Sequence, residues 1–368
     1  MAGERENTVA VIGGLGRMGV VTRRIFAEAG YIPIISDTKD PKTLSPREAI
    51  RQSGIIFFSV LPIENIEGII RLTADVFDET HRVLDNASWK GLLQEGYEIL
   101  DQRGVSICST HPLCNEKQPL FGQKVLIAPF GQRPQMATLL AESVYQRAGM
   151  VLRPIDFGKH DLTMLYNQLL PQLANRAVGH TLAQSGVDVE ALLAISTANS
   201  QLFSLANWRT LGQPSEISAM LISKSLQTPE GQAVVQALID SIGAIRQQGV
   251  QQEELEATFS TDVASLDPTG KTRAKMNEAS IIILEHLANL AKRSFVVETR
   301  EKDRPGLLHE LSGVIAANHI NLNTALSQRI EGGFRFHLGI EDGELTPEII
   351  EQLGKLGYQV IHLTNPRS

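Results

Sequence analysis

The stretch Thr8-Val9-Ala10-Val11-Ile12-Gly13-Gly14-Leu15-Gly16-Arg17-Met18-Gly19 decides how the N-terminal part of this chain folds. An apolar run enters a Gly-x-Gly-x-x-Gly spacing, and a helical pattern follows to Ala29, so we expect a strand, a tight turn and a helix. In this motif the first glycine allows the turn, the second lets the backbone approach a pyrophosphate, and the third lets helix and strand pack closely. The free amides at the helix N-terminus suit phosphate. We therefore expect a dinucleotide to contact Gly14, Leu15, Gly16, Arg17, Met18 and Gly19.

Asp37 directly follows the next apolar run, Tyr31–Ser36. A carboxylate at this place accepts a hydrogen bond from the adenosine ribose and repels a 2′-phosphate, which favours NAD over NADP. The alternative is that Asp37 only opens the polar turn that follows. Ser59 ends another apolar run, at the strand end where ligands of open sheets bind, and is a lower-ranked cofactor contact.

Three different patterns of apolar residues follow one another along the 368 residues. Residues 1–155 alternate five or six short apolar runs with amphipathic stretches, which indicates a parallel sheet with crossover helices. Residues 156–291 carry apolar side chains three and four apart, which predicts an all-helical domain with its own core or a dimer interface. Residues 294–368 read as a βαββαβ, ferredoxin-like unit. The expected fold class is therefore α/β: a Rossmann-type nucleotide-binding domain, an all-helical second domain and a ferredoxin-like C-terminal domain.

Composition excludes several classes of function. The formal net charge is −7 and no basic run is present, so we expect no nucleic-acid partner. The two cysteines, Cys108 and Cys114, cannot by themselves form a disulfide framework or a zinc site, and we expect no metal centre. We see neither a signal peptide nor a run long enough to cross a bilayer, so we expect no membrane partner and a cytoplasmic location.

Two loops at one edge of the expected sheet carry candidates for chemistry. Ser88 and Lys90 follow the apolar run ending in Leu84, and His111 follows the run from Val105 to Cys108. An imidazole suits the removal of an alcohol proton during hydride loss, because its pKa lies near neutrality. We therefore expect His111 and Ser88 to be catalytic. The alternatives are a hydrogen-bonded loop histidine, and a serine that caps a helix starting at Trp89.

Polar residues also interrupt the helical region. Arg209, near the end of a helical pattern, either shields the last carbonyls of its helix or clamps a substrate carboxylate. For His160 and Asp161 we favour a structural interpretation, with Asp161 as a helix cap.

These motifs, in this order, resemble the prephenate/arogenate dehydrogenases of tyrosine biosynthesis. The resemblance covers roughly residues 8–290, and the last seventy or so residues resemble an ACT domain through Lys302-Asp303-Arg304-Pro305-Gly306-Leu307-Leu308. It implies NAD-linked oxidation of prephenate at its ring hydroxyl, with loss of CO2 to give 4-hydroxyphenylpyruvate. It also implies that His111 takes the hydroxyl proton with support from Ser88, that Arg209 binds a substrate carboxylate, and that the chain forms a homodimer.

The chain departs from the family pattern where the substrate side chain is held. The family usually has a histidine at the position of Gln172, and often an arginine at that of Gln201. We place Gln168 and Gln172 in the substrate site, and Pro171 between them predicts a helix kink. Because glutamine carries no charge, prephenate, arogenate and 4-amino-4-deoxyprephenate all stay open as substrates. A non-catalytic sensor of NAD and an amino acid is the alternative from another class.

For the ACT-like part, the resemblance implies an amino-acid effector that binds near Gly306 and against a neighbouring strand containing Asn321. Tyrosine is the natural feedback ligand and phenylalanine the second choice. The alternative is a dimerisation module without a ligand. A β-hydroxyacid dehydrogenase ranks low, because the lysine expected four residues before Asn167 is Thr163 here.

Overall fold

The computed structural model describes residues 5–116, 118, 120–213, 215–249, 251–292, 294–300, 306–330 and 332–364. The chain divides into two compact units, Met1–Gln168 and Leu169–Ser368. The boundary expected between residues 155 and 156 stays a prediction.

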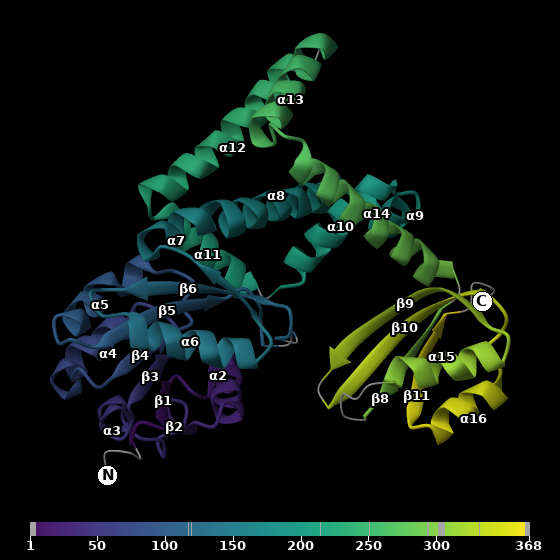
Figure 1. The fold of residues 1–368 in the computed structure, drawn as a ribbon. Coiled ribbons are helices and arrows are strands. Elements are labelled where there is room, and N and C mark those ends of the chain that lie inside the picture. Colours follow the sequence, from purple (N-terminus) through teal and green to yellow (C-terminus); the bar gives the residue numbers. More distant parts are fainter. Residues whose placement is uncertain are drawn as a thin grey trace. The chain divides into compact units, whose positions relative to one another are not determined.

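The first unit is built on a seven-stranded sheet with the order β2-β1-β3-β4-β5-β6-β7 (Figure 1). Its strands are β1 (Thr8–Ile12), β2 (Ile32–Ser36), β3 (Ile55–Phe58), β4 (Arg82–Asp85), β5 (Ser106–Pro112), β6 (Lys124–Phe130) and β7 (Val151–Pro154). The first five strands run parallel to one another, as expected for alternating strands and helices.

The sheet is not parallel throughout, which corrects one expectation. β6 pairs antiparallel with β5, with His111 opposite Leu126. A parallel return requires a crossover of a dozen or more residues, usually a helix. The residues that the structure describes between Pro112 and Lys124 form no helix. β7, which we did not expect, is short and partly exposed, so it lacks the apolar pattern of a buried strand.

Helices cover both faces of this sheet. α2 (Arg17–Glu28) and α6 (Gln135–Arg147) pack on one face, where residues such as Phe26, Phe57 and Val144 form the core. The other helices of this unit are α3 (Pro46–Arg51), α4 (Asn65–Thr73), α5 (Gln94–Asp101) and α7 (Phe157–Met164), with short turns η1 (Ala74–Val76) and η2 (Gly91–Leu93). The Rossmann-type architecture is confirmed.

The second unit begins with helices, as the apolar spacing predicts. They are α8 (Leu170–Ser185), α9 (Val189–Ala194), α10 (Ala198–Leu211), α11 (Ser215–Leu226), α12 (Pro229–Gln248), α13 (Gln252–Leu266) and α14 (Lys271–Lys292). Among the described side chains of these helices, Val234 is the one apolar side chain that is buried, at 7% exposed. The other described apolar side chains of these helices are therefore at least partly exposed within one chain.

Pro171 is the second residue of α8, and the helical residues continue without a gap from α7 to α8. The irregularity comes just before it, as a π-helical segment, η3 (Leu165–Leu169). Where we expected a kink, the helix therefore contains a π-helical segment directly before α8.

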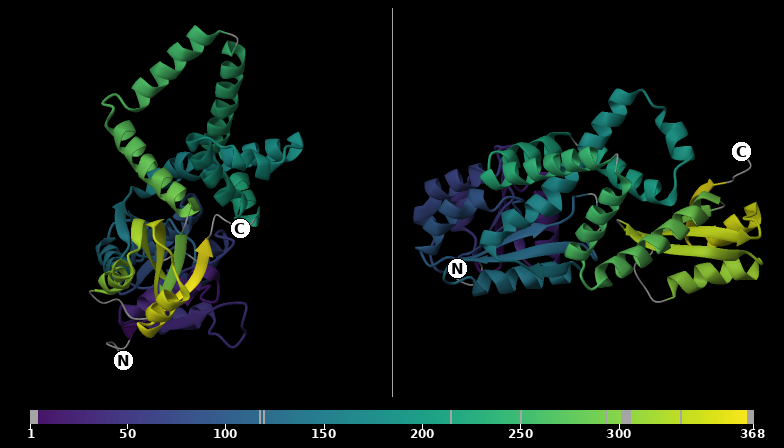
Figure 2. Two further views of the ribbon diagram at one scale, coloured as in Figure 1. Left: turned by 90° about the vertical axis from the view of Figure 1, so that its right-hand side faces the viewer. Right: turned by 90° about the horizontal axis from the view of Figure 1, so that it is seen from above.

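The C-terminal part has the expected βαββαβ order. It contains β8 (Ser294–Thr299), α15 (Leu307–Ala317), β9 (Asn321–Ile330), β10 (Gly333–Asp342), α16 (Pro347–Lys355) and β11 (Tyr358–Thr364). The antiparallel sheet has the order β11-β8-β10-β9, and α15 and α16 cover one face of it (Figure 2).

In the part of the chain that the structure describes, no helix combines the length and apolar character needed to cross a membrane. The cytoplasmic location stays a prediction.

Candidate active site

The glycine-rich loop between β1 and α2 is packed too closely for any side chain at two positions. Gly13 has a φ of +84°, and a Cβ there would lie 2.2 Å from the carbonyl oxygen of Ser59. A Cβ on Gly19 would lie 2.2 Å from the carbonyl oxygen of Gly13. The left-handed residue of the turn is therefore Gly13, one position before the glycine expected to make the turn. Gly19 has the close-packing role that the motif predicts.

The loop leaves its anion-binding groups available. Gly16 is the N-cap residue of α2, and no side chain caps that helix. The amides of the first turn are thus directed out of the helix N-terminus, together with its positive dipole end. Arg17 beside them is exposed, with its guanidinium 3.7 Å from Glu116.

Asp37 lies at the end of β2 next to this loop. Its Oδ2 accepts a hydrogen bond from the Leu15 amide at 2.7 Å, and its Oδ1 accepts one from the Lys39 amide at 2.9 Å. The carboxylate is therefore held beside the glycine loop. Ser59, at the end of β3, accepts a hydrogen bond from Asn86 Nδ2 at 3.0 Å, which links the ends of two central strands.

A buried ion pair lies at the carboxyl end of β4, next to β5. Asp85, at the end of β4, and Lys90 are both fully buried, with Oδ1 and Nζ 3.0 Å apart. The three Lys90 ammonium hydrogens are used, because Nζ also donates to the carbonyl oxygens of Ala87 and Thr110 at 2.8 Å each.

The Asp85 carboxylate is equally well satisfied. It also accepts hydrogen bonds from the Ala87 amide at 2.7 Å, the Tyr97 hydroxyl at 2.6 Å and the Ser109 hydroxyl. A buried pair persists when its remaining hydrogen-bonding groups are filled in this way. The loop from β4 to η2 is thereby fixed against β5.

His111 lies within β5, because that strand continues three residues past its last pairing with β4, at Ser109, and pairs there with β6. Its side chain is 5% exposed. Its Nδ1 lies 3.0 Å from Nε2 of His160 on α7, and its Nε2 lies 3.5 Å from Nε2 of Gln168 in η3. The structure thus brings His111 and Gln168 together.

Asp161 does not cap its own helix. Asp156 caps α7, while the Asp161 carboxylate accepts hydrogen bonds from the amides of Lys90 and Gly91 at 2.8 and 2.7 Å. It therefore caps η2 from another element, and its Oδ1 lies 2.7 Å from Nδ1 of His160. Our structural interpretation found the capping chemistry of Asp161 but missed both its partner and the contact of His160 with His111.

Ser88 is half-buried between Ala87 and Trp89. No hydrogen bond of its hydroxyl is present among the described residues, and the helical turn begins at Gly91 rather than at Trp89. The role of Ser88 stays a prediction.

Burial governs the titration of the two histidines. Burial first, then the charges of Lys90 and His160, hold the pKa of His111 well below its ordinary value. Burial also lowers the pKa of His160, whereas the hydrogen bond that its Nδ1 donates to Asp161 raises that pKa. Both rings are therefore neutral at neutral pH, and a neutral His111 has the proton-accepting form that a general base needs.

In the second unit, the expected substrate residues fall into two environments. Gln172 Nε2 donates to Gln213 Oε1 at 2.9 Å, and Gln172 Oε1 accepts from the Ser218 hydroxyl at 3.1 Å. Arg209 and Gln201 are exposed on α10. Their substrate roles stay predictions.

Arg176, one turn after Gln172, is a polar residue that our sequence reasoning missed. Its Nη2 donates to the carbonyl oxygens of Thr210 and Gln213 and to the Ser218 hydroxyl, at 3.1, 3.4 and 2.9 Å. Its buried Nε has no partner among the described residues. The sequence signal that could have identified Arg176 is its position four residues after Gln172, which puts both side chains on one face of a helix.

The expected effector residues lie in the C-terminal part. Gly306 has a φ of +99° at the N-terminus of α15, so it occupies a position where L side chains are strained. Asn321 begins β9 and donates to Glu341 at 2.8 Å. Residues 302–305 of the signature lie outside the described residues. No group of three or more His, Cys, Asp or Glu side chains in the described part is placed to hold a metal ion.

Comparison with known proteins identifies the family resemblance. Residues 295–358 match the ACT domain family. The chain is 25% identical over 218 residues, 59% of its length, to the T-protein of Enterobacter agglomerans, and covers 56% of that protein. It is 25% identical over 222 residues to the probable arogenate/prephenate dehydrogenase of Methanocaldococcus jannaschii, covering 56% of this chain and 49% of that protein. The chain thus spans about half the length of these relatives.

Solved structures show the same fold. Prephenate dehydrogenase from Aquifex aeolicus, in complex with hydroxyphenyl propionate and NAD+, aligns with a TM-score of 0.52 at 17% identity, over 71% of this chain and 97% of that one. Arogenate dehydrogenase from Synechocystis aligns with a TM-score of 0.50 at 17% identity, over 73% and 99%. The expected resemblance to prephenate/arogenate dehydrogenases and the C-terminal ACT domain are confirmed, and so is the fold class.

The buried histidines predict a fall in stability at mildly acidic pH. Burial lowers the folded-state pKa of His81, His111 and His160, whereas the unfolded chain binds protons with the ordinary value near ~6.5. Below that pH the unfolded state holds more protons, so the free energy of unfolding falls by up to about 1.4 kcal/mol per histidine and pH unit. Urea unfolding between roughly pH 7.5 and 5 measures this.

His81, whose ring contacts Arg5, Asp78 and Phe77, provides a separate test. The His81→Asn variant should show a shallower fall over the same range, because one of the three groups is gone. A free energy of unfolding that stays constant across this range would contradict the prediction.

Proposed function

We propose that this chain catalyses the NAD-dependent oxidative decarboxylation of prephenate to 4-hydroxyphenylpyruvate, a step of tyrosine biosynthesis. The observation that carries the proposal is His111. It is a buried, neutral imidazole at one edge of a Rossmann-type sheet that also bears an uncapped glycine-rich loop. The relatives named arogenate/prephenate dehydrogenase, and a neighbour solved with NAD+ and hydroxyphenyl propionate, support the same reaction.

The residues of the glycine loop fit NAD. Gly13 and Gly19 leave no room for a Cβ, Gly16 leaves the first turn of α2 uncapped, and Asp37 is held beside the loop. These residues would hold the pyrophosphate at the helix N-terminus and the ribose hydroxyls at Asp37. When bound, NAD+ supplies the acceptor for a hydride.

The chain itself must accept a proton. The ring C4–H bond breaks with its electrons leaving as a hydride, while the C4 hydroxyl gives its proton to His111 Nε2. The ring carboxylate then leaves as CO2, and its electron pair aromatises the ring. The proton returns to the phenolate oxygen, so the reaction releases no net proton. His111 is suited to both transfers because its neutral form predominates at neutral pH.

Arogenate dehydrogenase is the second candidate function. The observation that favours it is the uncharged Gln172, whose amide is already bonded to Gln213 and Ser218. Both substrates carry a side-chain carboxylate, but arogenate has an ammonium group where prephenate has a ketone. An uncharged amide does not repel that ammonium group, whereas a protonated histidine at this position would. Arg209 and Gln168 are the other substrate contacts we propose.

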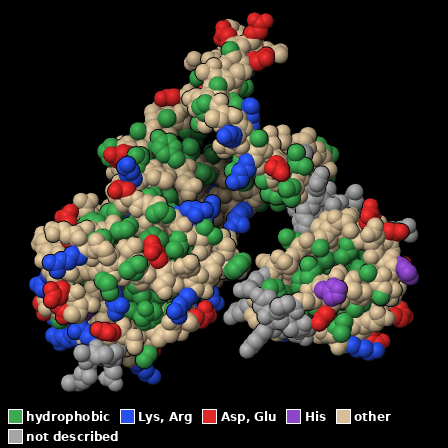
Figure 3. Space-filling model, in the orientation of Figure 1, with side chains coloured by type: hydrophobic (Ala, Val, Ile, Leu, Met, Phe, Trp, Pro, Cys, Tyr) green, Lys and Arg blue, Asp and Glu red, His purple; other side chains and the backbone are tan. Residues whose placement is uncertain are grey.

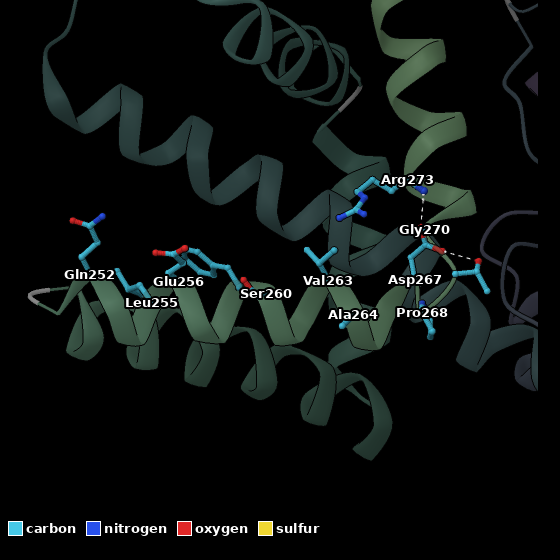
Figure 4. Close-up of a pocket in the computed structure, with 12 residues that line it drawn as sticks. Gln252, Leu255, Glu256, Ser260, Val263, Ala264, Asp267, Pro268, Gly270 and Arg273 are labelled. Atoms are coloured by element: carbon cyan, nitrogen blue, oxygen red, sulfur yellow. Dashed lines mark hydrogen bonds between the residues drawn. The ribbon is translucent and has the colours of Figure 1, made fainter.

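We also propose a homodimer formed through the helical part. Large apolar side chains lie on the outside of these helices, among them Ile242 at 59% and Leu266 at 86% exposed (Figure 3). A hollow of about 840 Å³ opens along α13, lined by Leu255, Phe259 and Val263 and closed by the turn that leads to α14 (Figure 4). Exposed apolar patches on a folded protein mark sites of interaction with other proteins.

For the ACT domain we propose feedback control by tyrosine. Gly306 turns the chain into α15, and β9, which begins at Asn321, is an edge strand of the sheet. An edge strand offers unpaired backbone groups to a second ACT unit or to an amino acid.

Turnover is tested by the absorbance of NADH at 340 nm after mixing the protein with NAD+ and either prephenate or arogenate. The His111→Asn variant should lower kcat by about a hundredfold or more, because general-base catalysis is lost. His309→Asn, a change at an exposed histidine on α15, should leave the rate unchanged. No NADH with either substrate sinks the proposed function, and survival of His111→Asn within about tenfold removes His111 as the base.

The dimer is tested by light scattering after size-exclusion chromatography. The expected mass is about twice the 40.3 kDa of one chain. Ile242→Glu on α12 should shift the protein toward the single-chain mass, since it places a charge on the apolar surface. Leu72→Glu on α4, where Leu72 is 75% exposed, is the matched control and should leave the mass unchanged. A wild-type mass of one chain refutes the dimer.

Effector binding is tested by calorimetric titration with tyrosine and with phenylalanine. Gly306→Ala should weaken tyrosine binding about tenfold, because a left-handed conformation costs an L residue about 1–2 kcal/mol. Gly313→Ala within α15, where a Cβ meets nothing within 4 Å, should bind as the wild type does. The absence of binding heat with both amino acids contradicts the proposal.

A further inference from the structure

Three side chains from two elements form a continuous hydrogen-bonded line that ends at His111. Asp161 Oδ1 lies 2.7 Å from His160 Nδ1, and His160 Nε2 lies 3.0 Å from His111 Nδ1. Both rings are almost completely out of solvent, with His160 at 0% and His111 at 5% exposed. Protein groups rather than bulk water therefore decide where the ring protons reside.

The direction of these hydrogen bonds follows from counting protons. A carboxylate only accepts, so His160 Nδ1 must carry the hydrogen that points at Asp161. A neutral imidazole has one N–H, which leaves His160 Nε2 as an acceptor. His111 Nδ1 must then donate to it, and His111 Nε2 is left with a free lone pair.

The surroundings favour neutral rings over a charged His160. The Lys90 ammonium lies close enough to disfavour a second positive charge on either ring, and burial acts in the same direction. Asp161 and Asp85 are the negative groups that act on His160, and Asp85 is already paired with Lys90. A charged His160 would also donate to His111 Nδ1 and place the His111 proton on Nε2, where it would block proton uptake.

The π-helical segment adds a second support. It places Gln168 with its Nε2 3.5 Å from His111 Nε2, at the outer limit of a hydrogen bond. An amide N–H facing that nitrogen is compatible with a bare lone pair and incompatible with an N–H. π-helical turns are frequent at functional sites, because they shift the residues that a helix presents.

We propose that Asp161 and His160 are positioning residues that hold His111 in the tautomer with hydrogen on Nδ1, so that Nε2 is the proton acceptor. His160 connects the Asp161 carboxylate to His111 through hydrogen bonds, and this connection, rather than its packing against His111, fixes the tautomer of His111. The arrangement is established by the structure of the first unit alone, while its kinetic consequence rests on the proposed dehydrogenase function.

The tautomer is tested directly by two-bond ¹⁵N–¹H correlation spectra of protein labelled at histidine, with His111 and His160 assigned by single substitution. We expect hydrogen on Nδ1 and a bare Nε2 in both rings of the wild type. In Asp161→Asn the amide nitrogen disrupts the acceptor pattern, so the His111 ring should populate the opposite tautomer. A wild-type His111 with hydrogen on Nε2 overturns the proposal whether or not the protein turns over prephenate.

Kinetics of two substitutions at one position separate orientation from packing. In His160→Gln the side-chain oxygen can accept from His111 Nδ1, so kcat should stay within about tenfold of the wild type. In His160→Leu the volume is kept but the acceptor is lost, and kcat should fall about a hundredfold or more with KM for prephenate unchanged. If leucine preserves turnover and glutamine does not, His160 is a packing residue and the proposal fails.

The two measurements also separate this inference from the proposed function. The expected tautomer in a protein that turns over neither prephenate nor arogenate sustains the positioning roles and refutes the dehydrogenase assignment. Turnover by a wild type with the opposite tautomer sustains the dehydrogenase and refutes the positioning roles.

Discussion

The buried pair of Asp85 and Lys90 is the constraint on which the sheet edge that carries His111 depends. Removing two charges from water costs several kcal/mol per ion, and the cost is offset only where every hydrogen-bonding group of both ions is filled. Here the three hydrogens of the ammonium and the two oxygens of the carboxylate all have partners. Because those partners include the carbonyl of Thr110, the pair joins β4 to β5 next to His111.

The same pair determines where Asp161 can bind. The ion pair fixes the Lys90 backbone, and the amides of Lys90 and Gly91 then form a two-hydrogen fork that Asp161 closes. With both oxygens engaged, the carboxylate of Asp161 has a fixed orientation when it meets His160. Each contact in the series from the Asp85–Lys90 pair through Asp161 to His160 therefore limits the orientation of the next side chain.

The sequence predicts the fold much better than it predicts this site. Apolar periodicity and glycine spacing are local signals, so the strands, the helices and the close packing of Gly19 could be read directly. The antiparallel β6 could not be derived from its own apolar run, because strand direction depends on what connects it to β5. The resemblance singles out His111, whose catalytic role stays a prediction. Its contact with His160 spans 49 residues of sequence, a separation at which a local pattern carries no signal.

The residues that we propose for chemistry and those that we propose for substrate selectivity lie in separate compact units of this chain. The glycine loop, the ion pair and His111 lie in Met1–Gln168, whereas Gln172, Arg176 and Arg209 lie in Leu169–Ser368. The polar groups around Gln172 bond mainly to one another, and the apolar surfaces of their helices stay exposed within one chain. Substitutions that alter this second group can therefore change which side chain is recognised without disturbing the proton acceptor. His111 together with an uncharged Gln172 is the combination that such a division allows.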